Sequence, residues 1–443
     1  MGREIQGDYE TGFMTSRLAH ILSLLMFAAV PAAAQRPVTV VAVPPLTTPD
    51  DRKTSAGSTA AIAWQATQLI VSDLRSTELV PTRPDQKDFY SYPEVTAPTY
   101  SRWRSAGAGA LLTGFVRAQP DGRLAVGCYV YDVKAGRALG RIGFVVAPED
   151  WRRAAHKCSD LVYSKVIGAP GGMFDTRIAY IAQNGTGRAR VKRVAVMDND
   201  GENHRYLTAG DSLVLTPRQS PGGERVAFVS FLGGQPHVML ADAASGEQRA
   251  LVPNGAISFA PRFSADGQRI AFSMMLGANS DIYLAAASGG AVQRLTQAPG
   301  VDTSPSFSPD GSRIVFESDR SGSQQLYIMN TDGSGQRRLS FGGARYAAPE
   351  WSPDGEWIAF TRRGPDGLRI GVIKPDGTGE RLLTDGSGDE GASWAPSAST
   401  LLFQRTDTAG RSTLWRVALS GGPPRRVTTP QDASDPDWSG TAE

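Results

Sequence analysis

Cysteine and histidine are scarce in this chain of 443 residues, which contains two cysteines and four histidines. The two cysteines, Cys128 and Cys158, are too few for a disulfide-rich scaffold or a thiolate zinc site. Cys128 falls on the face of an expected strand, and Cys158 falls on the apolar face of an expected helix. In an oxidising compartment the two could form a single disulfide, and two buried thiols are the other interpretation. No group near either cysteine would activate a thiolate for catalysis.

A large excess of one charge is also absent. The 46 Lys and Arg residues nearly balance the 44 Asp and Glu residues, which gives a formal net charge of +2. The charges are scattered along the chain and form no acidic or basic tail. Nucleic-acid-binding proteins concentrate basic residues into a patch or stripe, so we expect no nucleic-acid partner.

Long apolar runs are missing as well, apart from Leu18–Val30 near the N-terminus. This run is too short to span a bilayer but has the length of the apolar region of a signal peptide. It leads into Ala32-Ala33-Ala34, a small-residue cleavage pattern, so residues 1–34 are expected to be a signal peptide. Three acidic residues precede the run, which is unusual for a signal peptide and favours translation from Met14. The sequence therefore predicts an exported protein.

Glycine and proline, in contrast, are abundant, with 49 and 29 residues. Many of them belong to a repeat whose clearest copy, Phe307–Phe316, reads FSPDGSRIVF. Ser-Pro-Asp-Gly is typical of a tight turn between two strands, because Pro fixes φ and Gly accepts a positive φ. The repeat recurs about every 44 residues, which is the period of four-stranded propeller blades. Its leading residues are Gln219, Phe263, Phe307, Trp351, Trp394 and Trp438.

Each of the four strand types in the repeat is expected six times along the chain, which gives a six-bladed β-propeller over residues 173–443. The propeller begins on the second strand of its first blade. The missing innermost strand is then supplied by Pro436–Ser439 at the C-terminal end. We expect this strand to close the ring, because closure leaves no unpaired sheet edge at the junction.

Residues 36–168 lack the repeat and combine strand and helix signals. The expected order β-α-β-α-β-β-β-α is typical of a small mixed sheet with helices packed on it, and bounds follow from the pattern for four of these strands and two of these helices. The expected strands cover Pro37–Leu46, Leu111–Arg117, Leu124–Val133 and Arg141–Val146, and the helices cover Ser58–Arg75 and Pro148–Ile167. The fold class is thus multi-domain, a small N-terminal α/β domain followed by an all-β propeller. Ala169–Gly172 is the expected hinge between them.

Motifs for catalysis are absent from the sequence. No G-x-S-x-G nucleophile elbow occurs, no histidines are spaced as a metal pair, and the turn positions explain the frequent Asp and Gly residues. We therefore expect no catalytic residues, no metal and no cofactor. The alternative is a propeller enzyme, either a metal-dependent lactonase or a carbohydrate-active enzyme. It would need carboxylates or histidines that converge on the channel.

The repeat F-S-P-D-G-x-x-I-A-F, the junction Phe174–Tyr180 (FDTRIAY) and the segment Asp198–Gly201 (DNDG) resemble the TolB family. These proteins are periplasmic propellers of the Tol–Pal system in Gram-negative bacteria, and the resemblance covers essentially the whole mature chain. It implies a periplasmic monomer that binds the peptidoglycan-associated lipoprotein Pal through the propeller mouth. It also implies a role in outer-membrane integrity and in envelope constriction during cell division, with membranes reached only through partners.

Family members also carry an extended segment that contacts TolA, ahead of the first strand of the N-terminal domain. If cleavage follows Ala34, only Gln35, Arg36 and Pro37 precede that strand here. The expectation of a TolA contact is correspondingly weaker than the expectation of a Pal contact.

The residues that enter each innermost strand should surround one mouth of the channel, and they vary where the repeat is otherwise regular. Phe259, Arg345 and Tyr346 are residue types that anchor interfaces. Asp302, Asp389 and Glu390 would make the mouth acidic, which predicts a partner loop rich in basic or amide groups. The expected partner-binding residues are Ser258, Phe259, Asp302, Thr303, Arg345, Tyr346, Asp389 and Glu390.

Overall fold

The computed structural model describes residues 39–82, 92–168, 172–185, 187–252 and 256–440. The expected signal peptide, the alternative start at Met14, the residues before the first strand and most of the expected hinge lie outside this range. All described elements belong to one compact unit, Thr39–Glu443. Across the described part of the chain, the helices are too short or too polar to cross a membrane.

The N-terminal part contains a mixed five-stranded sheet with the strand order β4-β1-β5-β6-β7. Strands β4, β1 and β5 are parallel, and β5, β6 and β7 form the expected antiparallel meander. The strands of this sheet are β1 (Val40–Ala42), β4 (Val80–Pro81), β5 (Ala110–Ala118), β6 (Leu124–Asp132) and β7 (Arg137–Val146). A short hairpin, β2 (Lys53–Thr54) and β3 (Gly57–Ser58), precedes the first helix.

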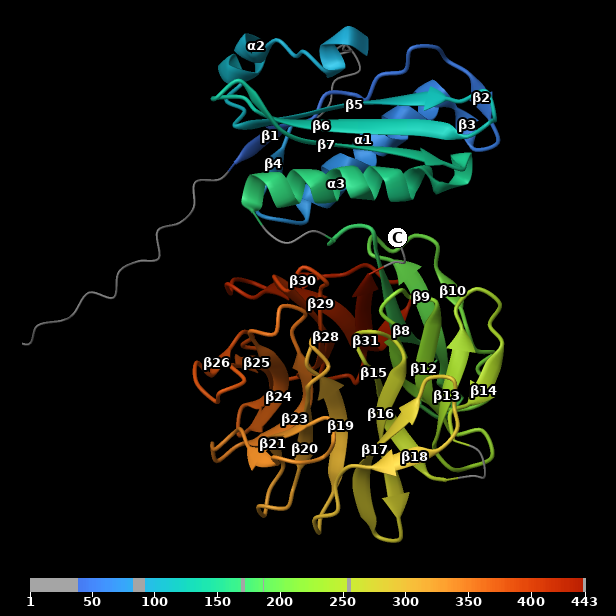
Figure 1. The fold of residues 1–443 in the computed structure, drawn as a ribbon, viewed down its shortest axis with the longest axis vertical. Coiled ribbons are helices and arrows are strands. Elements are labelled where there is room, and N and C mark those ends of the chain that lie inside the picture. The colour runs from blue at the N-terminus through green and yellow to red at the C-terminus, as the bar shows by residue number, and fades with distance from the viewer. Residues whose placement is uncertain (1–38, 83–91, 169–171, 186, 253–255, 441–443) are drawn as a thin grey trace, which may run out of the picture. The chain divides into compact units, whose positions relative to one another are not determined.

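Helices cover both faces of this sheet, as Figure 1 shows. Helices α1 (Thr59–Arg75) and α3 (Trp151–Ile167) pack on one face, and α2 (Tyr100–Ser105) covers the other. The Ser58 hydroxyl caps α1 by accepting a hydrogen bond from the Ala61 N–H at 3.2 Å. Helix α3 ends at Gly168, whose φ of 77° is the left-handed conformation that stops a helix. The expected α/β arrangement is confirmed.

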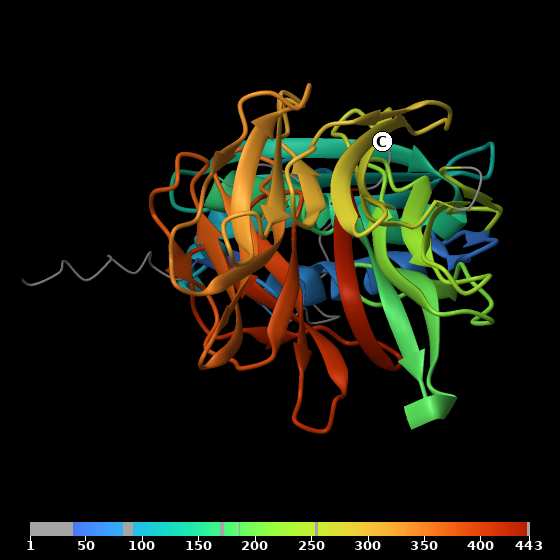
Figure 2. The same cartoon turned by 90° about the horizontal axis from the view of Figure 1, so that it is seen from below.

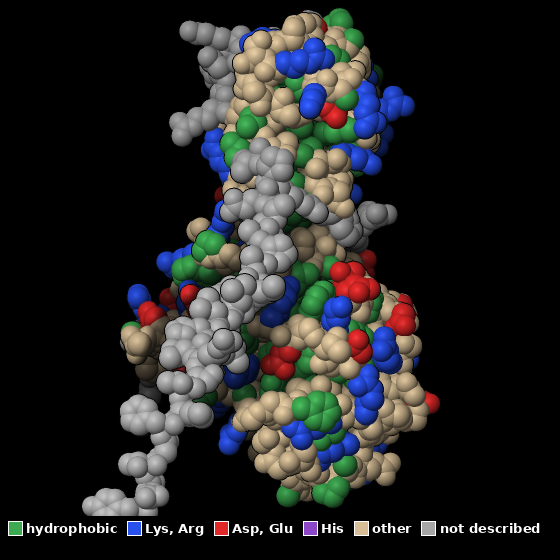
Figure 3. Space-filling model, turned by 90° about the vertical axis from the view of Figure 1, so that its left-hand side faces the viewer, with side chains coloured by type: hydrophobic (Ala, Val, Ile, Leu, Met, Phe, Trp, Pro, Cys, Tyr) green, Lys and Arg blue, Asp and Glu red, His purple; other side chains and the backbone are tan. Residues whose placement is uncertain are grey.

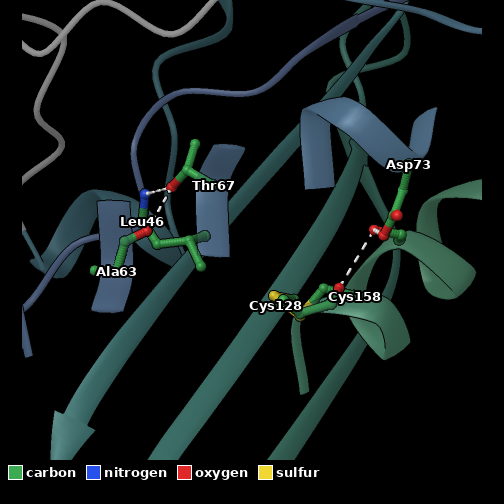
Figure 4. Close-up of a disulfide and its surroundings, with 8 residues drawn as sticks. Leu46, Ala63, Thr67, Asp73, Cys128 and Cys158 are labelled. Carbon is green, nitrogen blue, oxygen red and sulfur yellow. Dashed lines mark hydrogen bonds between the residues drawn. A yellow bond between two sulfur atoms is a disulfide. The ribbon is translucent and has the colours of Figure 1, made fainter. Parts of the chain in front are cut away.

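A disulfide joins Cys128 on β6 to Cys158 on α3, with 5.8 Å between the Cα atoms (Figure 4). Both residues are fully buried in the core between the sheet and the helices. In the same core the Thr67 hydroxyl donates to the Ala63 carbonyl at 2.7 Å and accepts from the Leu46 N–H at 2.9 Å. Of the two alternatives left open by the sequence, the structure has the disulfide.

Residues 176–440 form six four-stranded antiparallel sheets, which confirms the six-bladed propeller. Each blade is named here by its strands from the innermost to the outermost. Blade 1 is β31 (Asp432–Gly440), β8 (Thr176–Asn184), β9 (Val191–Asp198) and β10 (Arg205–Tyr206); blade 2 is β11 (Val214–Gln219), β12 (Arg225–Ser230), β13 (His237–Asp242) and β14 (Gln248–Ala250); blade 3 is β15 (Ser258–Phe263), β16 (Arg269–Leu276), β17 (Asn279–Ala286) and β18 (Val292–Arg294). Blade 4 is β19 (Asp302–Phe307), β20 (Arg313–Ser318), β21 (Gln325–Asn330) and β22 (Arg337–Arg338); blade 5 is β23 (Arg345–Trp351), β24 (Ile358–Gly364), β25 (Gly367–Ile373) and β26 (Arg381–Leu382); blade 6 is β27 (Asp389–Trp394), β28 (Thr400–Thr406), β29 (Ser412–Ala418) and β30 (Arg425–Arg426).

The Ser-Pro-Asp-Gly turns connect the two inner strands of a blade, as the sequence predicts. In blade 4 the Gly311 N–H donates to the Ser308 carbonyl at 2.9 Å, and Gly311 has a φ of 67°. The Ser308 hydroxyl accepts the Arg313 N–H at 3.0 Å and so fixes the start of the next strand. This positive φ is the physical reason for glycine at the fourth position of the motif.

The C-terminal strand β31 closes the ring by pairing with β8, and Figure 2 shows the two side by side. Trp438 lies opposite Ile178, and its indole N–H donates to the Thr176 hydroxyl at 2.8 Å. Closure by the last strand is confirmed, although the strand is longer than the expected Pro436–Ser439. Its extra residues at the start, from Asp432, contribute to the mouth described below.

A buried ionic cluster connects helices α1 and α3 with blade 1. His156 on α3 is 2% exposed, and its Nδ1 lies 2.9 Å from Asp73 Oδ2 on α1. Its Nε2 lies 3.5 Å from Asp200 Oδ2 in the turn after β9. Burial disfavours the charged imidazolium, but the two carboxylates outweigh it and raise the pKa of His156 to about 10. His156 is therefore a cation at neutral pH.

Candidate functional site: the propeller mouth

Every innermost strand carries a bulge near its entry, where its register with the second strand shifts. In five blades the bulged residue has a φ between 46° and 54° and is followed by proline. Proline cannot donate to the sheet, and a bulge re-aims the side chain that follows it. The bulged residues are Thr216, Ala260, Ser304, Ala348 and Asp435, with Gly391 at the same place in blade 6.

The residues two positions after the bulge form a polar ring around the channel. In blades 4, 5, 6 and 1 this side chain accepts a hydrogen bond from the main-chain N–H of the following blade, at distances of 2.7–3.1 Å. The ring therefore connects neighbouring blades through buried polar contacts. Its members, called the channel ring below, are Arg218, Arg262, Ser306, Glu350, Ser393 and Asp437.

Arg262 crosses the channel within this ring. Its Nη2 lies 2.8 Å from Glu350 Oε2 on blade 5, and its Nη1 lies 3.3 Å from Asp437 Oδ1 on blade 1. Burial lowers the pKa of Arg218, which lies beside this group, and burial raises the pKa of Asp437. Two arginines and two carboxylates thus face one another at the bottom of the mouth, and their formal charges cancel.

A cavity of about 370 Å³ opens above the channel ring, and the bulged residues of all six blades line it. Arg218 and Arg262 lie at its floor. Arg345 and Arg363 on blade 5 are exposed at its edge, and Glu390 on blade 6 lies half-buried beside them. The charged residues in its lining are Arg218, Arg262, Arg345, Arg363, Glu390 and Asp435.

Two of the eight expected partner-binding residues, Arg345 and Glu390, line this cavity. Phe259 and Thr303 are half-buried near the mouth but lie outside the lining. The other four are at most 2% exposed and offer no surface to a partner in this conformation, which corrects the expectation for them. These four are Ser258, Asp302, Tyr346 and Asp389.

The buried residues have structural partners instead. The Ser258 hydroxyl accepts the Val238 N–H at 3.0 Å, which connects the inner strand of blade 3 to blade 2. The Tyr346 hydroxyl donates to Glu380 at 2.8 Å, and its ring packs 5.1 Å from the ring of Phe360. Tyr346 therefore belongs to the blade core rather than to a partner surface.

The acidic mouth expected from the sequence is also corrected, because its aspartates are neutralised inside the blades. Asp302 binds Arg320 at 2.6 Å, and Asp389 binds Arg405 through two hydrogen bonds of 2.6 and 2.8 Å. Glu390 accepts the Gln404 amide at 2.9 Å, and burial raises its pKa. The exposed charges that remain at the edge of the cavity are the guanidinium groups of Arg345 and Arg363.

The buried carboxylate of Glu317 holds two residues of the cavity lining in place. Glu317 on β20 is 5% exposed, accepts the Gln324 amide at 2.7 Å and accepts the Ala348 N–H at 3.2 Å. Both partners line the cavity. Burial raises the pKa of Glu317 to about 6, because these two hydrogen bonds only partly offset the loss of water.

Sequence reasoning missed the channel ring and Arg363. The ring had a signal, since the position before each leading Phe or Trp varies among Arg, Ser, Glu and Asp while its neighbours repeat. Arg363 had none, because it lies near the end of a regular strand and reaches the mouth only through its pairing with Arg345. Among the described residues, no group of three or more His, Cys, Asp or Glu side chains could hold a metal ion.

Two family models match the chain. The TolB beta propeller domain matches residues 163–442, and the TolB amino-terminal domain matches residues 33–139. The chain belongs to the TolB family. Its fold agrees with the crystal structure of TolB from Acinetobacter baumannii at a TM-score of 0.76 and 25% identity, over 91% of this chain and 97% of that one.

Curated relatives of the TolB family are more similar in sequence. The Tol-Pal system protein TolB of Zymomonas mobilis is 52% identical over 213 residues, which are 48% of this chain and 46% of that protein. The protein of the same name from Rhizorhabdus wittichii is 48% identical over 229 residues, which are 49% of this chain and 52% of that protein. The chain spans about half the length of the curated relatives it matches.

Proposed function

We propose that this chain is a periplasmic, non-catalytic component of the Tol–Pal system whose propeller mouth binds a Pal-like lipoprotein. In this role it supports outer-membrane integrity and envelope constriction during cell division. The names of its relatives support membership of the Tol–Pal system, and the cavity supports the propeller mouth as the binding surface. The disulfide between Cys128 and Cys158 supports export to an oxidising compartment.

The observation that carries the proposal is the polar cavity above the channel ring. Hydrogen-bonded side chains of this ring lie across the channel below the cavity, so a partner that enters the mouth meets a polar floor. A cavity of about 370 Å³ admits a few side chains of a protein loop. Contact with TolA would involve residues ahead of Thr39, which lie outside the described part of the chain.

The test is a binding titration with the lipid-free domain of the Pal-like lipoprotein from the same organism, by isothermal calorimetry. Ala347 lines the cavity and is half-buried, so Ala347→Trp should fill the mouth and lower affinity at least about tenfold. Glu356 is exposed directly after the Ser-Pro-Asp-Gly turn at the other end of blade 5, so Glu356→Trp is the matched control. Absence of binding to the unaltered protein, or equal loss in both variants, would contradict the proposal.

A further inference from the structure

Two arginines face each other at the edge of the mouth. Arg345 at the start of β23 is the register partner of Arg363 near the end of β24. Side chains directly opposite on antiparallel strands lie on the same side of the sheet, about 5 Å apart at Cβ. Both residues are exposed, and both line the cavity.

The other five blades show what the propeller itself needs at this position. None of them places two cations there, although all six blades share the bulge and the fold around it. Like charges directly opposite each other are unfavourable, so the arginine pair is not explained by the packing of the blade. The equivalent pairs are Leu213 and Phe231, Ile257 and Met275, Val301 and Asp319, Gly388 and Thr406, and Asp432 and Gln183.

Two other arginines at this end of the propeller have carboxylate partners. Arg320 binds Asp302, and Arg405 binds Asp389. Within the described residues, Arg345 and Arg363 make neither an ion pair nor a side-chain hydrogen bond. The nearby Glu390 accepts from Gln404 instead. The edge of the cavity therefore presents two guanidinium groups that no carboxylate pairs directly, although the half-buried, hydrogen-bonded Glu390 attracts Arg363.

We propose that Arg345 and Arg363 form a carboxylate-binding subsite, which takes an Asp or Glu side chain from the loop of the partner protein that enters the mouth. Guanidinium groups bind carboxylates in a planar, two-pronged geometry, and a bound carboxylate also removes the repulsion between the two arginines. This inference rests on the proposed function, since it names the chemistry by which the partner is recognised. It reverses the sign of the charge that the sequence predicts for the partner loop.

The apolar side chains around the mouth indicate that the carboxylate belongs to a protein. Leu213, Met275 and Val301 are 43%, 38% and 42% exposed at the entry of blades 2, 3 and 4. Phe341, in the loop that leads to Arg345, is 74% exposed. A loop with an acidic residue over blade 5 and an apolar residue over blades 2 to 4 would use both surfaces. A free phosphate would use the arginines alone.

The decisive experiment measures the affinity of charge-reversed variants for the lipid-free domain of the Pal-like lipoprotein. Arg345→Glu and Arg363→Glu should each lower affinity at least about tenfold, because each replaces an attraction by a repulsion. Arg426 is exposed on the outermost strand of blade 6, so Arg426→Glu makes the same charge change away from the mouth and should change affinity less than about twofold. Unchanged or tighter binding by the two mouth variants would overturn the inference while leaving the proposed function intact.

A second measurement keeps the inference testable if the lipoprotein does not bind. Saturation-transfer NMR would compare tetraglutamate and tetralysine as probes of the full chain. Tetraglutamate should receive saturation from the unaltered protein and from Arg426→Glu, and the signal should fall at least about fivefold in Arg345→Glu. A stronger signal from tetralysine, or equal tetraglutamate signals in all proteins, would overturn the inference.

The source of the carboxylate is tested in the same assays. Leu213→Ser and Met275→Ser should weaken binding of the lipoprotein domain at least about threefold while leaving the tetraglutamate signal unchanged. If inorganic phosphate displaces the lipoprotein domain completely and the two serine variants bind it normally, the subsite serves a free anion, and the assignment to a protein loop is wrong.

Discussion

Arg262 on blade 3 reaches across the propeller channel to Glu350 on blade 5, with 2.8 Å between Nη2 and Oε2. Glu350 in turn accepts the Ser393 hydroxyl at 3.0 Å and the Trp394 N–H at 3.1 Å on blade 6. One ion pair therefore holds together blades that are not neighbours in the ring. The same pair forms the floor of the mouth.

Removal of Arg262 should destabilise the propeller. Arg262→Met leaves Glu350 and Asp437 largely buried without their shared cation, which costs about 3–5 kcal/mol. Urea unfolding monitored by tryptophan fluorescence would measure the loss. The double variant Arg262→Met/Glu350→Gln should lose less than the single variant, because it also removes a buried charge. A loss below about 1 kcal/mol in the single variant would contradict this account of the floor.

Glu317 should make stability depend on pH in the mildly acidic range. Its pKa is about 6 in the folded protein, raised by burial from an ordinary value of 4.5. The folded chain then holds the proton to a higher pH, so stability falls as the pH rises from about 4.5 to 6. Glu317→Gln should remove this fall and gain about 1–2 kcal/mol at pH 7.

Asp310 provides the control for this measurement. Its hydrogen bonds to the Ser308 and Ser312 hydroxyls and to the Ser312 N–H lower its pKa to about 2, so its titration lies below the window. Asp310→Asn should leave the slope between pH 4.5 and 6 unchanged. An equal slope in Glu317→Gln and the unaltered protein would show that Glu317 is not the responsible group.

His156 should make stability depend on pH in the alkaline range. A histidine pKa raised from 6.5 to about 10 contributes stability that is complete below about pH 6.5 and is lost as the pH rises towards 10. His156→Gln should cost about 3–5 kcal/mol at pH 6, because Asp73 keeps its burial and loses its cation. The loss should shrink steadily between pH 7 and pH 9.5.

The comparison for His156 is His237→Gln, since the ring of His237 bonds the Ala256 carbonyl at 3.0 Å rather than a carboxylate. His237→Gln should lose stability with rising alkaline pH in the same way as the unaltered protein. If His156→Gln shows this loss too, the cluster of His156, Asp73 and Asp200 does not act as described.

The disulfide should contribute measurably to the N-terminal part of the chain. Cys128 and Cys158 are separated by 30 residues, and closing a loop of that size stabilises a fold by about 3–4 kcal/mol. Cys128→Ser/Cys158→Ser should lower the thermal unfolding temperature, and dithiothreitol should have the same effect on the unaltered protein but none on the variant. Insensitivity of the unaltered protein to dithiothreitol would contradict the bridge.

Much of the fold could be predicted because every blade repeats a similar turn and strand pattern in the sequence. The Ser-Pro-Asp-Gly turn sets a positive φ at Gly311, and the spacing of Trp438 from Trp394 places the closing strand in register. Whether the two cysteines form a disulfide could not be predicted. The sequence places one on a strand and the other on a helix, but it does not give the distance between the two sulfur atoms. That distance depends on how the helix packs on the sheet.

The charge of the mouth could not be predicted, because it depends on contacts within and between strands. Asp302 lies at the start of an innermost strand, as expected for a mouth residue. Arg320, from the loop after the next strand, binds its carboxylate and neutralises it. Arg363 lies at the cavity because it pairs with Arg345 on the neighbouring strand. One residue more or fewer in the turn between the two strands would change this register and place a different residue there. Figure 3 shows basic and acidic side chains intermixed on the face that it draws, so the summed charge of the chain does not reveal the pair.

The central claim is that a protein partner occupies the propeller mouth. Hydrogen–deuterium exchange of the chain with and without the lipid-free Pal-like domain would test it most directly. We predict slower exchange at residues 345–349 and 361–368, two segments that contain residues of the cavity lining, and unchanged exchange in the turn at Pro353–Gly355 at the other end of blade 5. Protection of that turn or of the outermost strands, with none at the mouth, would contradict the account.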